Sequence, residues 1–83
     1  MRVVFTHSAF RQFKKLGNYI QKRIDEKLIL YTSQSNPLRF ADKLQDLRFG
    51  SFRFRVGDYR ILFDIQGDLI VILKVGHRKD VYK

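Results

Sequence analysis

Residues 52–63 read FRFRVGDYRILF, and this stretch decides the fold. Apolar residues alternate with arginines up to the pair Gly57-Asp58, and a second alternating run begins at Tyr59. An alternation with a period of two predicts a strand with one apolar face, and a glycine-first pair between two such runs predicts a two-residue hairpin turn. We therefore expect two antiparallel strands whose pairing is fixed by this turn.

The predicted pairing gives the hairpin one apolar face and one basic face. It sets Val56 against Tyr59, Arg55 against Arg60, Phe54 against Ile61, and Phe52 against Phe63. Arg53, Arg55 and Arg60 then emerge together on the face away from the core. Because like charges that oppose each other on a sheet are destabilising, one interpretation is that the arginines are kept to hold an anion such as a phosphate. The other interpretation is a solvated charged face, with Asp58 or Asp64 as the partner of an arginine.

The stretch that follows predicts a second hairpin. Gln66-Gly67-Asp68 supplies a turn, and Leu69–Val75 is an apolar run typical of a strand covered on both faces. Simple two-residue turns place Lys74 on the face that packs against the helices, and Arg78 with it. Arg78 joins the other arginines only if a bulge or a bend at Gly76 changes its side.

The N-terminal part predicts a strand followed by a helix. Residues 2–6 read as a short strand, and Thr6 or Ser8 can cap the helix after it. Apolar positions spaced by three and four mark the helix face: Ala9, Phe10, Phe13 and Leu16. Gly17 suits the C-terminus of this helix.

A second helix is predicted before Pro37. Asn18 and Gln21 have the spacing of a capping box, and one face of the helix carries Ile20, Ile24, Leu28 and Tyr31. Residues 38–50 are compatible with either one short helix or a loop pinned by apolar anchors. The predicted order is β-α-α-β-β-β, an α+β fold in which a helical hairpin packs on one face of a mostly antiparallel sheet. We expect residues 1–83 to form a single domain.

Composition narrows the function classes. The 83 residues contain 17 Lys and Arg against 8 Asp and Glu, a net charge of +9, which favours a polyanionic partner such as nucleic acid. The absence of cysteine and the presence of only two histidines argue against a structural metal site or a disulfide framework. The longest apolar run is too short to span a bilayer, so we expect no membrane partner.

Two C-terminal residues are candidates for chemistry. His77 stands beside Arg78, and imidazole is the side chain that exchanges protons near neutral pH, so proton transfer is one interpretation and a structural role at a strand end is the other. Tyr82 can stack on a base or cover the edge of the sheet.

Two motifs carry a resemblance to a known family. Residues 52–63 resemble the "yRiRvGdYRvly" signature of the RelE/ParE toxin superfamily of prokaryotic toxin–antitoxin systems. The ending VGHRKDVY, residues 75–82, resembles the "vgHRxdvY" terminus of its RelE-like branch. Pro37 and Leu44 fall where the family has a proline and a connecting segment, so the resemblance covers nearly the whole chain.

The resemblance implies the compact RelE fold and a defined activity. That activity is ribosome-dependent cleavage of messenger RNA in the A site, in which the 2′-hydroxyl attacks the adjacent phosphate without a metal or a small-molecule cofactor. It also implies a cognate RelB-like antitoxin as partner, together with the ribosome and mRNA, in the cytoplasm of a bacterium or an archaeon.

The family's functional residues carry over onto matching positions. Arg60 matches the arginine of "YR" and Arg78 the arginine near the C-terminus, and both are expected to stabilise the charge that develops on the phosphate. Tyr82 matches a terminal tyrosine that orients the substrate or stacks on it. Arg53 and Arg55 match positions that are lysines in the prototype toxin. Because arginine stays protonated, Arg55 is expected to stabilise charge and not to accept a proton.

This substitution leaves the general base without an assignment. We place His77 as the hypothesis for proton transfer. RNA contact is expected from Arg53, Lys74 and Lys79.

Two other functions remain open at this point. ParE-like relatives share the fold and bind DNA gyrase, although the ending His77-Arg78 with Tyr82 favours the RNase branch. The third interpretation is a non-toxic module that binds RNA or a partner protein. An antitoxin would inhibit by laying a helix on the basic surface, by displacing the last strand and Tyr82, or by both.

Overall fold

The computed structural model describes the whole chain, residues 1–83. The elements in order are β1 (Arg2–Phe5), α1 (His7–Lys14), α2 (Asn18–Thr32), the 3-10 turn η1 (Pro37–Phe40), β2 (Asp42–Lys43), the 3-10 turn η2 (Leu47–Phe49), β3 (Phe52–Val56), β4 (Tyr59–Gln66) and β5 (Leu69–His77). The predicted order is confirmed with one addition. The segment from Pro37 to Gly50, in which residues 38–50 are compatible in sequence with a helix or a loop, contains two short 3-10 turns with the two-residue strand β2 between them.

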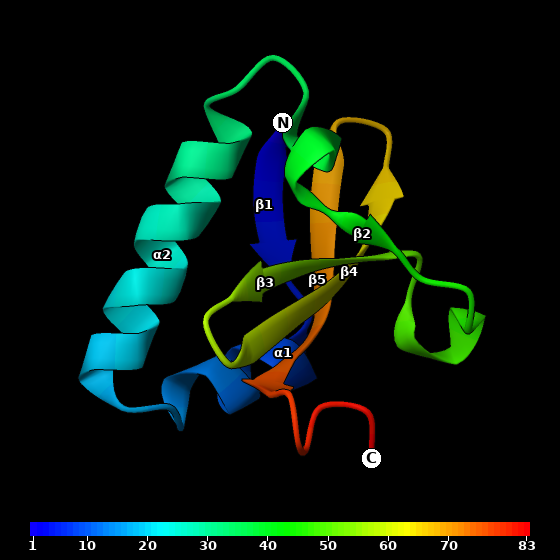
Figure 1. The fold of residues 1–83 in the computed structure, drawn as a ribbon. Helices are drawn as coiled ribbons and strands as arrows, with labels where there is room; N and C mark the ends of the chain where they lie inside the picture. Colours follow the sequence, from blue (N-terminus) through cyan, green and yellow to red (C-terminus); the bar gives the residue numbers. More distant parts are fainter.

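The five strands form one mixed sheet in the order β1-β5-β4-β3-β2 (Figure 1). Only β1 and β5 run parallel, and the other neighbours are antiparallel. The β3–β4 register is the one that the alternation predicts, with Arg55 opposite Arg60 and Phe54 opposite Ile61. Gly57 has a φ of 59°, the left-handed conformation that the first position of this turn requires.

The helices begin and end partly as expected. The Thr6 hydroxyl accepts a hydrogen bond from the amide of Ala9 at 3.2 Å, so Thr6 caps α1. The predicted capping box of α2 is wrong, because Gly17 occupies the cap position and no side chain bonds there. The Gln21 amide instead donates to the carbonyl of Leu16 at 2.8 Å, and so satisfies a carbonyl just past the end of α1. Neither helix has the length and apolar character needed to cross a bilayer.

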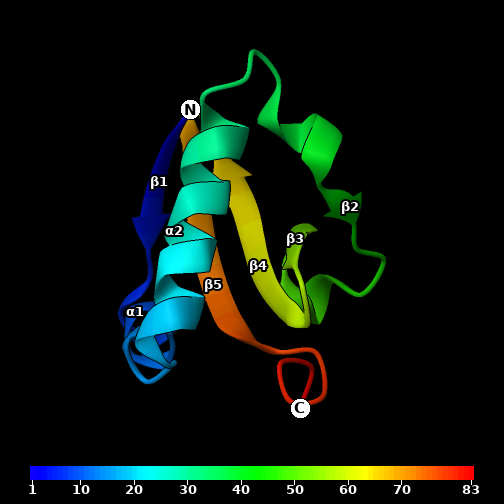
Figure 2. The ribbon, with the colours of Figure 1, turned by 60° about the vertical axis from the view of Figure 1, so that its left-hand side comes forward.

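The core lies between the two helices and one face of the sheet. Figure 2, seen from the side of α2, shows this helix lying over the strands. The cluster contains Ala9 and Phe13 from α1, Ile24 and Leu28 from α2, and Phe54, Val56, Ile61, Phe63, Ile70, Ile72 and Val75 from the strands. The sheet residues alternate along their strands, so the side chains between them point to the helix-free face.

A bulge in β5 determines what that second face contains. Leu62 pairs with Lys74 and Phe63 pairs with Ile72, so Leu73 is an extra residue on β5. The bulge therefore turns Lys74 away from the helices, which corrects the expectation that Lys74 shares their face. The predicted change of side thus occurs at Leu73 and not at Gly76, which lies opposite Arg60.

Candidate functional site

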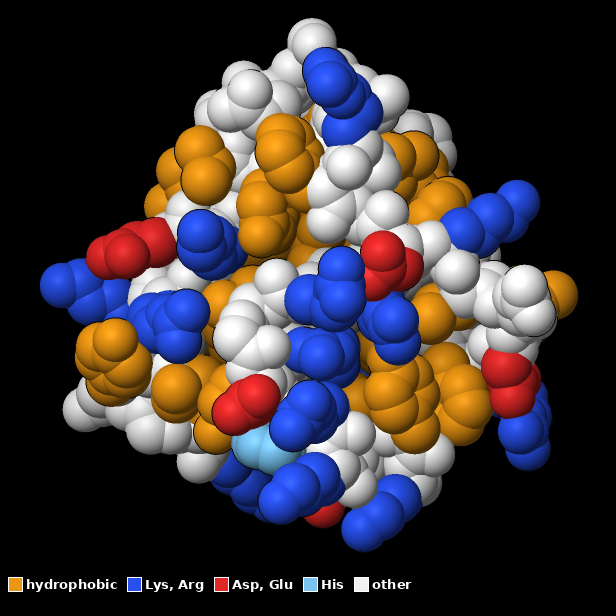
Figure 3. Space-filling view, in the orientation of Figure 1, with side chains coloured by type: hydrophobic (Ala, Val, Ile, Leu, Met, Phe, Trp, Pro, Cys, Tyr) orange, Lys and Arg blue, Asp and Glu red, His pale blue; other side chains and the backbone are white.

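Basic side chains gather on the helix-free face of the sheet. Figure 3 shows a column of Lys and Arg side chains running down the middle of this view. Strands β3, β4 and β5 place four cations on this face, because each alternates with a core residue: Arg53 and Arg55 on β3, Arg60 on β4, and Lys74 on β5. Arg55 and Arg60 lie directly opposite each other in the register. The predicted basic face therefore exists, and it needs counter-charges from elsewhere.

Asp42 of β2 supplies the counter-charge for two of these arginines. Its Oδ2 lies 3.2 Å from Nε of Arg53 and 3.1 Å from Nε of Arg55. The partners expected from the sequence are engaged elsewhere: Asp58 lies 3.7 Å from Arg78, and Asp64 accepts a hydrogen bond from the backbone amide of Ser51. Sequence reasoning missed Asp42 because the two-residue strand that carries it has no readable alternation.

Arg53 also joins the strand to the C-terminal residues. Its Nη1 donates to the hydroxyl of Tyr82 at 2.7 Å. This hydrogen bond, with a smaller contribution from Asp42, raises the pKa of Arg53 above its ordinary value. The ring of Tyr82 meets the ring of Phe49 edge to face, with centroids 5.4 Å apart. Tyr82 is therefore brought to the basic face, and η2 supplies the surface against which its ring rests.

Arg60 is held at the β3–β4 turn. Its Nη1 donates to the carbonyls of Gly57 at 2.8 Å and Tyr59 at 2.9 Å. Arg23 of α2 reaches the same turn, because its Nη1 lies 3.2 Å from where a Cβ on Gly57 would stand. The turn thus has contacts with a guanidinium from α2 and with a guanidinium from β4. The sequence indicates only a solvated helix position for Arg23, since its spacing does not reveal a contact with the turn.

The residues after β5 fold back over the basic face. The Lys74 ammonium donates to the backbone oxygens of Val81 at 3.0 Å and Lys83 at 2.9 Å. Val81 is buried beside Gly76, where a Cβ would stand 3.6 Å from the Cβ of Val81, an ordinary van der Waals contact. Lys74 therefore fastens this terminal segment, in addition to adding positive charge to the face.

Arg78 and Lys79 stand at the exposed end of this face. The backbone amide of Arg78 donates to the carbonyl of Asp58 at 2.7 Å, while its side chain is 57% exposed. Lys79 is exposed as well, and its amide donates to Nδ1 of His77 at 3.1 Å. The backbone of Arg78 is thus fixed by a hydrogen bond, and its guanidinium is open to solvent.

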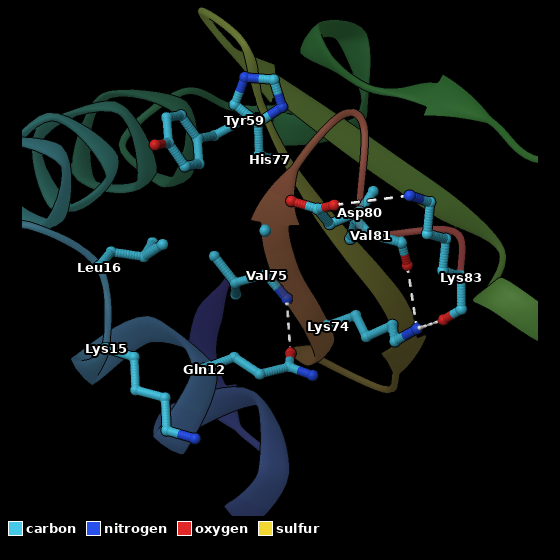
Figure 4. A pocket seen from close by; sticks show the side chains of 11 residues that line it. Gln12, Lys15, Leu16, Tyr59, Lys74, Val75, His77, Asp80, Val81 and Lys83 are labelled. Atoms are coloured by element: carbon cyan, nitrogen blue, oxygen red, sulfur yellow. Dashed lines mark hydrogen bonds and ion pairs between the residues drawn. The ribbon is translucent and has the colours of Figure 1, made fainter.

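His77 lies on the other side of the sheet end. It pairs with Tyr59, which packs against the core, and the two rings meet edge to face at 5.4 Å. No hydrogen bond joins His77 to an arginine. Its side chain lines a cleft of about 470 Å³ together with residues of α1 and of the C-terminal segment (Figure 4). The structure brings Arg53, Arg55 and Tyr82 into direct contact with one another or with a shared carboxylate, and His77 stands apart from them.

The cleft follows the free edge of β5 beyond the end of β1. The amide of Val75 points out of this edge and donates to Oε1 of Gln12 at 3.0 Å. Figure 4 shows Gln12 and Lys15 rising from α1 on one side, with Asp80 and Lys83 on the other. Asp80 and Lys83 pair across 3.8 Å. The cleft therefore mixes apolar walls with three lysines, Lys15, Lys74 and Lys83, and one carboxylate, Asp80.

Comparisons with known proteins agree on one group of relatives. A family model described as the ParE toxin of the type II toxin–antitoxin system parDE matches residues 3–82. The chain is 35% identical over 86 residues to Toxin RelE3 of Methanocaldococcus jannaschii, covering 99% of this chain and 96% of that toxin. It is 36% identical over 83 residues to Toxin RelG of Mycobacterium tuberculosis, covering 98% and 94%.

The fold is likewise similar to a solved toxin–antitoxin structure. A chain in the crystal structure of the complex RelBE2 from Mycobacterium tuberculosis superposes with a TM-score of 0.79 at 35% identity. The match covers 93% of this chain and 96% of that chain. The likeness thus spans both the helical hairpin and the sheet that carries the basic face.

Proposed function

This chain belongs to the RelE-like toxins of the RelE/ParE superfamily, the toxin components of type II toxin–antitoxin systems, and from this membership we propose that it is a ribosome-dependent endoribonuclease. It would cut messenger RNA in the A site and be neutralised in the cytoplasm by a cognate RelB-like antitoxin. The observation that carries the proposal is the gathering of Arg53, Arg55 and Arg60 with Tyr82 on one face of the sheet, with Arg78 at its end.

The proposed reaction needs positive charge around one phosphate. The 2′-oxygen attacks phosphorus, the bond from phosphorus to the 5′-oxygen breaks, and the products are a 2′,3′-cyclic phosphate and a 5′-hydroxyl. Negative charge grows on the phosphate oxygens in the transition state, so guanidiniums fixed in advance stabilise it. Arg60, held by two carbonyls, and Arg78, open to solvent, are assigned to these oxygens.

The other residues have supporting roles in the proposal. Arg55 adds electrostatic stabilisation, and Arg53, Lys74 and Lys79 contact the RNA backbone. Tyr82 orients or stacks on a base, since aromatic rings are the common platform for unstacked RNA bases. His77, which pairs with Tyr59 at the end of the sheet, is the proposed proton-transfer group.

The same face suits an acidic antitoxin. The net charge of +9 and the exposed cations favour a negatively charged partner segment. RelBE2, a similar structure, is a toxin–antitoxin complex, which supports a RelB-like partner for this chain. An antitoxin segment that covers the arginines or lifts Tyr82 from Arg53 would remove the arrangement on which cleavage depends.

Paired substitutions test the proposed nuclease. We expect Arg78→Ala to lower A-site cleavage on programmed ribosomes by about 100-fold to 1,000-fold, the usual cost of removing one fixed charge-stabilising group. Arg2→Ala is the matched control, because Arg2 is an exposed arginine on the edge strand β1 that pairs with Leu69, at the opposite end of β5 from His77 and Arg78. Primer extension on a defined message measures both rates. Equal cleavage by the two variants would contradict the proposal.

One observation favours a second candidate, inhibition of DNA gyrase. The matching family model is described as the ParE toxin, and ParE-like relatives act on gyrase. In that case Arg60→Ala and Arg78→Ala would leave a block of supercoiling largely intact. A supercoiling assay with purified gyrase therefore separates the two functions.

A further inference from the structure

Asp42 is the only carboxylate that contacts two arginines. One oxygen, Oδ2, lies 3.2 Å from Nε of Arg53 and 3.1 Å from Nε of Arg55. Arg53 in turn donates through Nη1 to Tyr82 at 2.7 Å. Asp42, Arg53, Arg55 and Tyr82 thus form one connected polar chain across β2, β3 and the C-terminal segment.

We propose that Asp42 is a positioning residue, which aligns Arg53 and Arg55 toward the scissile phosphate and, through Arg53, orients Tyr82. This role rests on the proposed endoribonuclease activity. The atoms through which Asp42 contacts the two guanidiniums support this role. A guanidinium has five N–H donors, and Arg53 donates its Nε–H to Asp42, whereas Arg55 forms an ion pair with the same oxygen through Nε. The side chain of Arg55 takes part in no hydrogen bond, so its N–H donors remain free for a phosphate.

Backbone hydrogen bonds hold Asp42 in place beside β3. Asp42 pairs with Arg53 in the β2–β3 register, and the amide of Leu44 donates to the carbonyl of Ser51 at 2.8 Å. The carboxylate is therefore held against β3 by backbone hydrogen bonds, independently of its side-chain contacts. An arginine has many rotamers, and a fixed acceptor at Nε removes most of that freedom before the substrate arrives.

The exposure of these side chains indicates that the contacts of Asp42 with Arg53 and Arg55 serve the alignment of the arginines more than the stability of the fold. The side chains are 30% exposed at Arg53, 40% at Asp42 and 60% at Arg55. Ion pairs with this exposure contribute little to folding because water and salt screen them. A substitution at Asp42 is therefore expected to leave the fold intact and to change the arginines.

The test substitutes Asp42→Asn, with Asp68→Asn as the matched control. Both changes add one positive charge, and Asp68 lies in the turn between β4 and β5, at the opposite end of β5 from His77. In ¹H–¹⁵N spectra of the free protein, we expect the Nε–H signal of Arg53 to lose its protection from solvent exchange, and the Nε–H signal of Arg55 to change its chemical shift, in Asp42→Asn only.

Kinetics on ribosomes supply the functional readout. We expect Asp42→Asn to lower kcat by about 10-fold to 100-fold through misplaced guanidiniums, while RNA binding stays equal or tightens because a nearby negative charge is gone. A merely structural residue would weaken binding and kcat together, and a residue that acts only through charge would leave kcat unchanged. Either result would overturn the positioning role.

Three outcomes separate the positioning role from the alternatives. Loss of one limb of the pH–rate profile in Asp42→Asn would mean that the carboxylate accepts a proton itself, which also overturns the proposal. Absence of cleavage by the wild-type protein would remove the proposed nuclease and this role together. Wild-type cleavage that Asp42→Asn matches in kcat would remove the positioning role alone.

Discussion

At the scale of single residues, the basic face is organised by hydrogen bonds to partly exposed groups. Arg53 contacts a carboxylate and a hydroxyl, and Arg60 contacts two carbonyls of its own turn. The opposition of Arg55 and Arg60 is tolerated because Asp42 neutralises one side of it. Substitutions of these residues are therefore expected to change the rate of cleavage more than the free energy of unfolding.

His77 allows a direct test at this scale. It stands across the sheet end from Arg60, with Nδ1 accepting from the amide of Lys79, so only Nε2 is free to exchange a proton with a substrate. If His77 transfers the proton, His77→Ala should slow cleavage and remove one limb of the pH–rate profile, with RNA affinity unchanged. Single-turnover rates across pH measure this. An unchanged rate and profile would exclude His77 from the mechanism.

At the scale of elements, the β3–β4 hairpin is predictable from the sequence and its neighbours are not. Strict alternation and a glycine-first turn are enough to determine that Arg55 lies opposite Arg60. The bulge at Leu73 is hidden, because every residue of the run Leu69–Leu73 is apolar and a change of side leaves no trace in such a pattern. Strand β2 is too short to carry a pattern at all, so the sequence does not reveal the role of Asp42.

The turn of this hairpin makes a stability prediction. Gly57 has a φ of 59°, where a Cβ is strained, whereas Gly17 has a φ of −59° and open space around it. Gly57→Ala should lower the free energy of unfolding by about 1–2 kcal/mol. Gly17→Ala should change it by less than about 0.5 kcal/mol, because reduced chain entropy offsets the poorer helix cap. Urea unfolding of both variants provides the comparison, and equal losses would contradict the assigned turn.

At the scale of the whole molecule, charge is distributed by the topology. The helices and the core occupy one face of the sheet, so cations on β3, β4 and β5 must share the other (Figure 3). The C-terminal segment folds onto that face and places Tyr82 beside Arg53. In the proposed function, the net charge of +9 would attract RNA at long range, and the arginines would determine where the phosphate binds.

The salt dependence of RNA affinity tests whether RNA binds to this basic face. If four cation–phosphate pairs form between the basic face and single-stranded RNA, the log–log slope of affinity against salt should be about −3. Arg78→Ala should reduce the magnitude of the slope by about 0.7, and Arg2→Ala should leave it unchanged. Fluorescence anisotropy with a short oligoribonucleotide measures the slopes. Equal slopes for all three proteins would show that RNA binds elsewhere on the molecule.

The most direct measurement of the proposed activity is cleavage of a defined message by the purified wild-type protein, with and without ribosomes stalled on it. We expect cuts only when ribosomes are present, at the A-site codon, with downstream fragments that accept labelled phosphate at a free 5′-hydroxyl. Absence of cuts, cuts that need no ribosome, or fragments that carry a 5′-phosphate would contradict a ribosome-dependent attack by the 2′-hydroxyl.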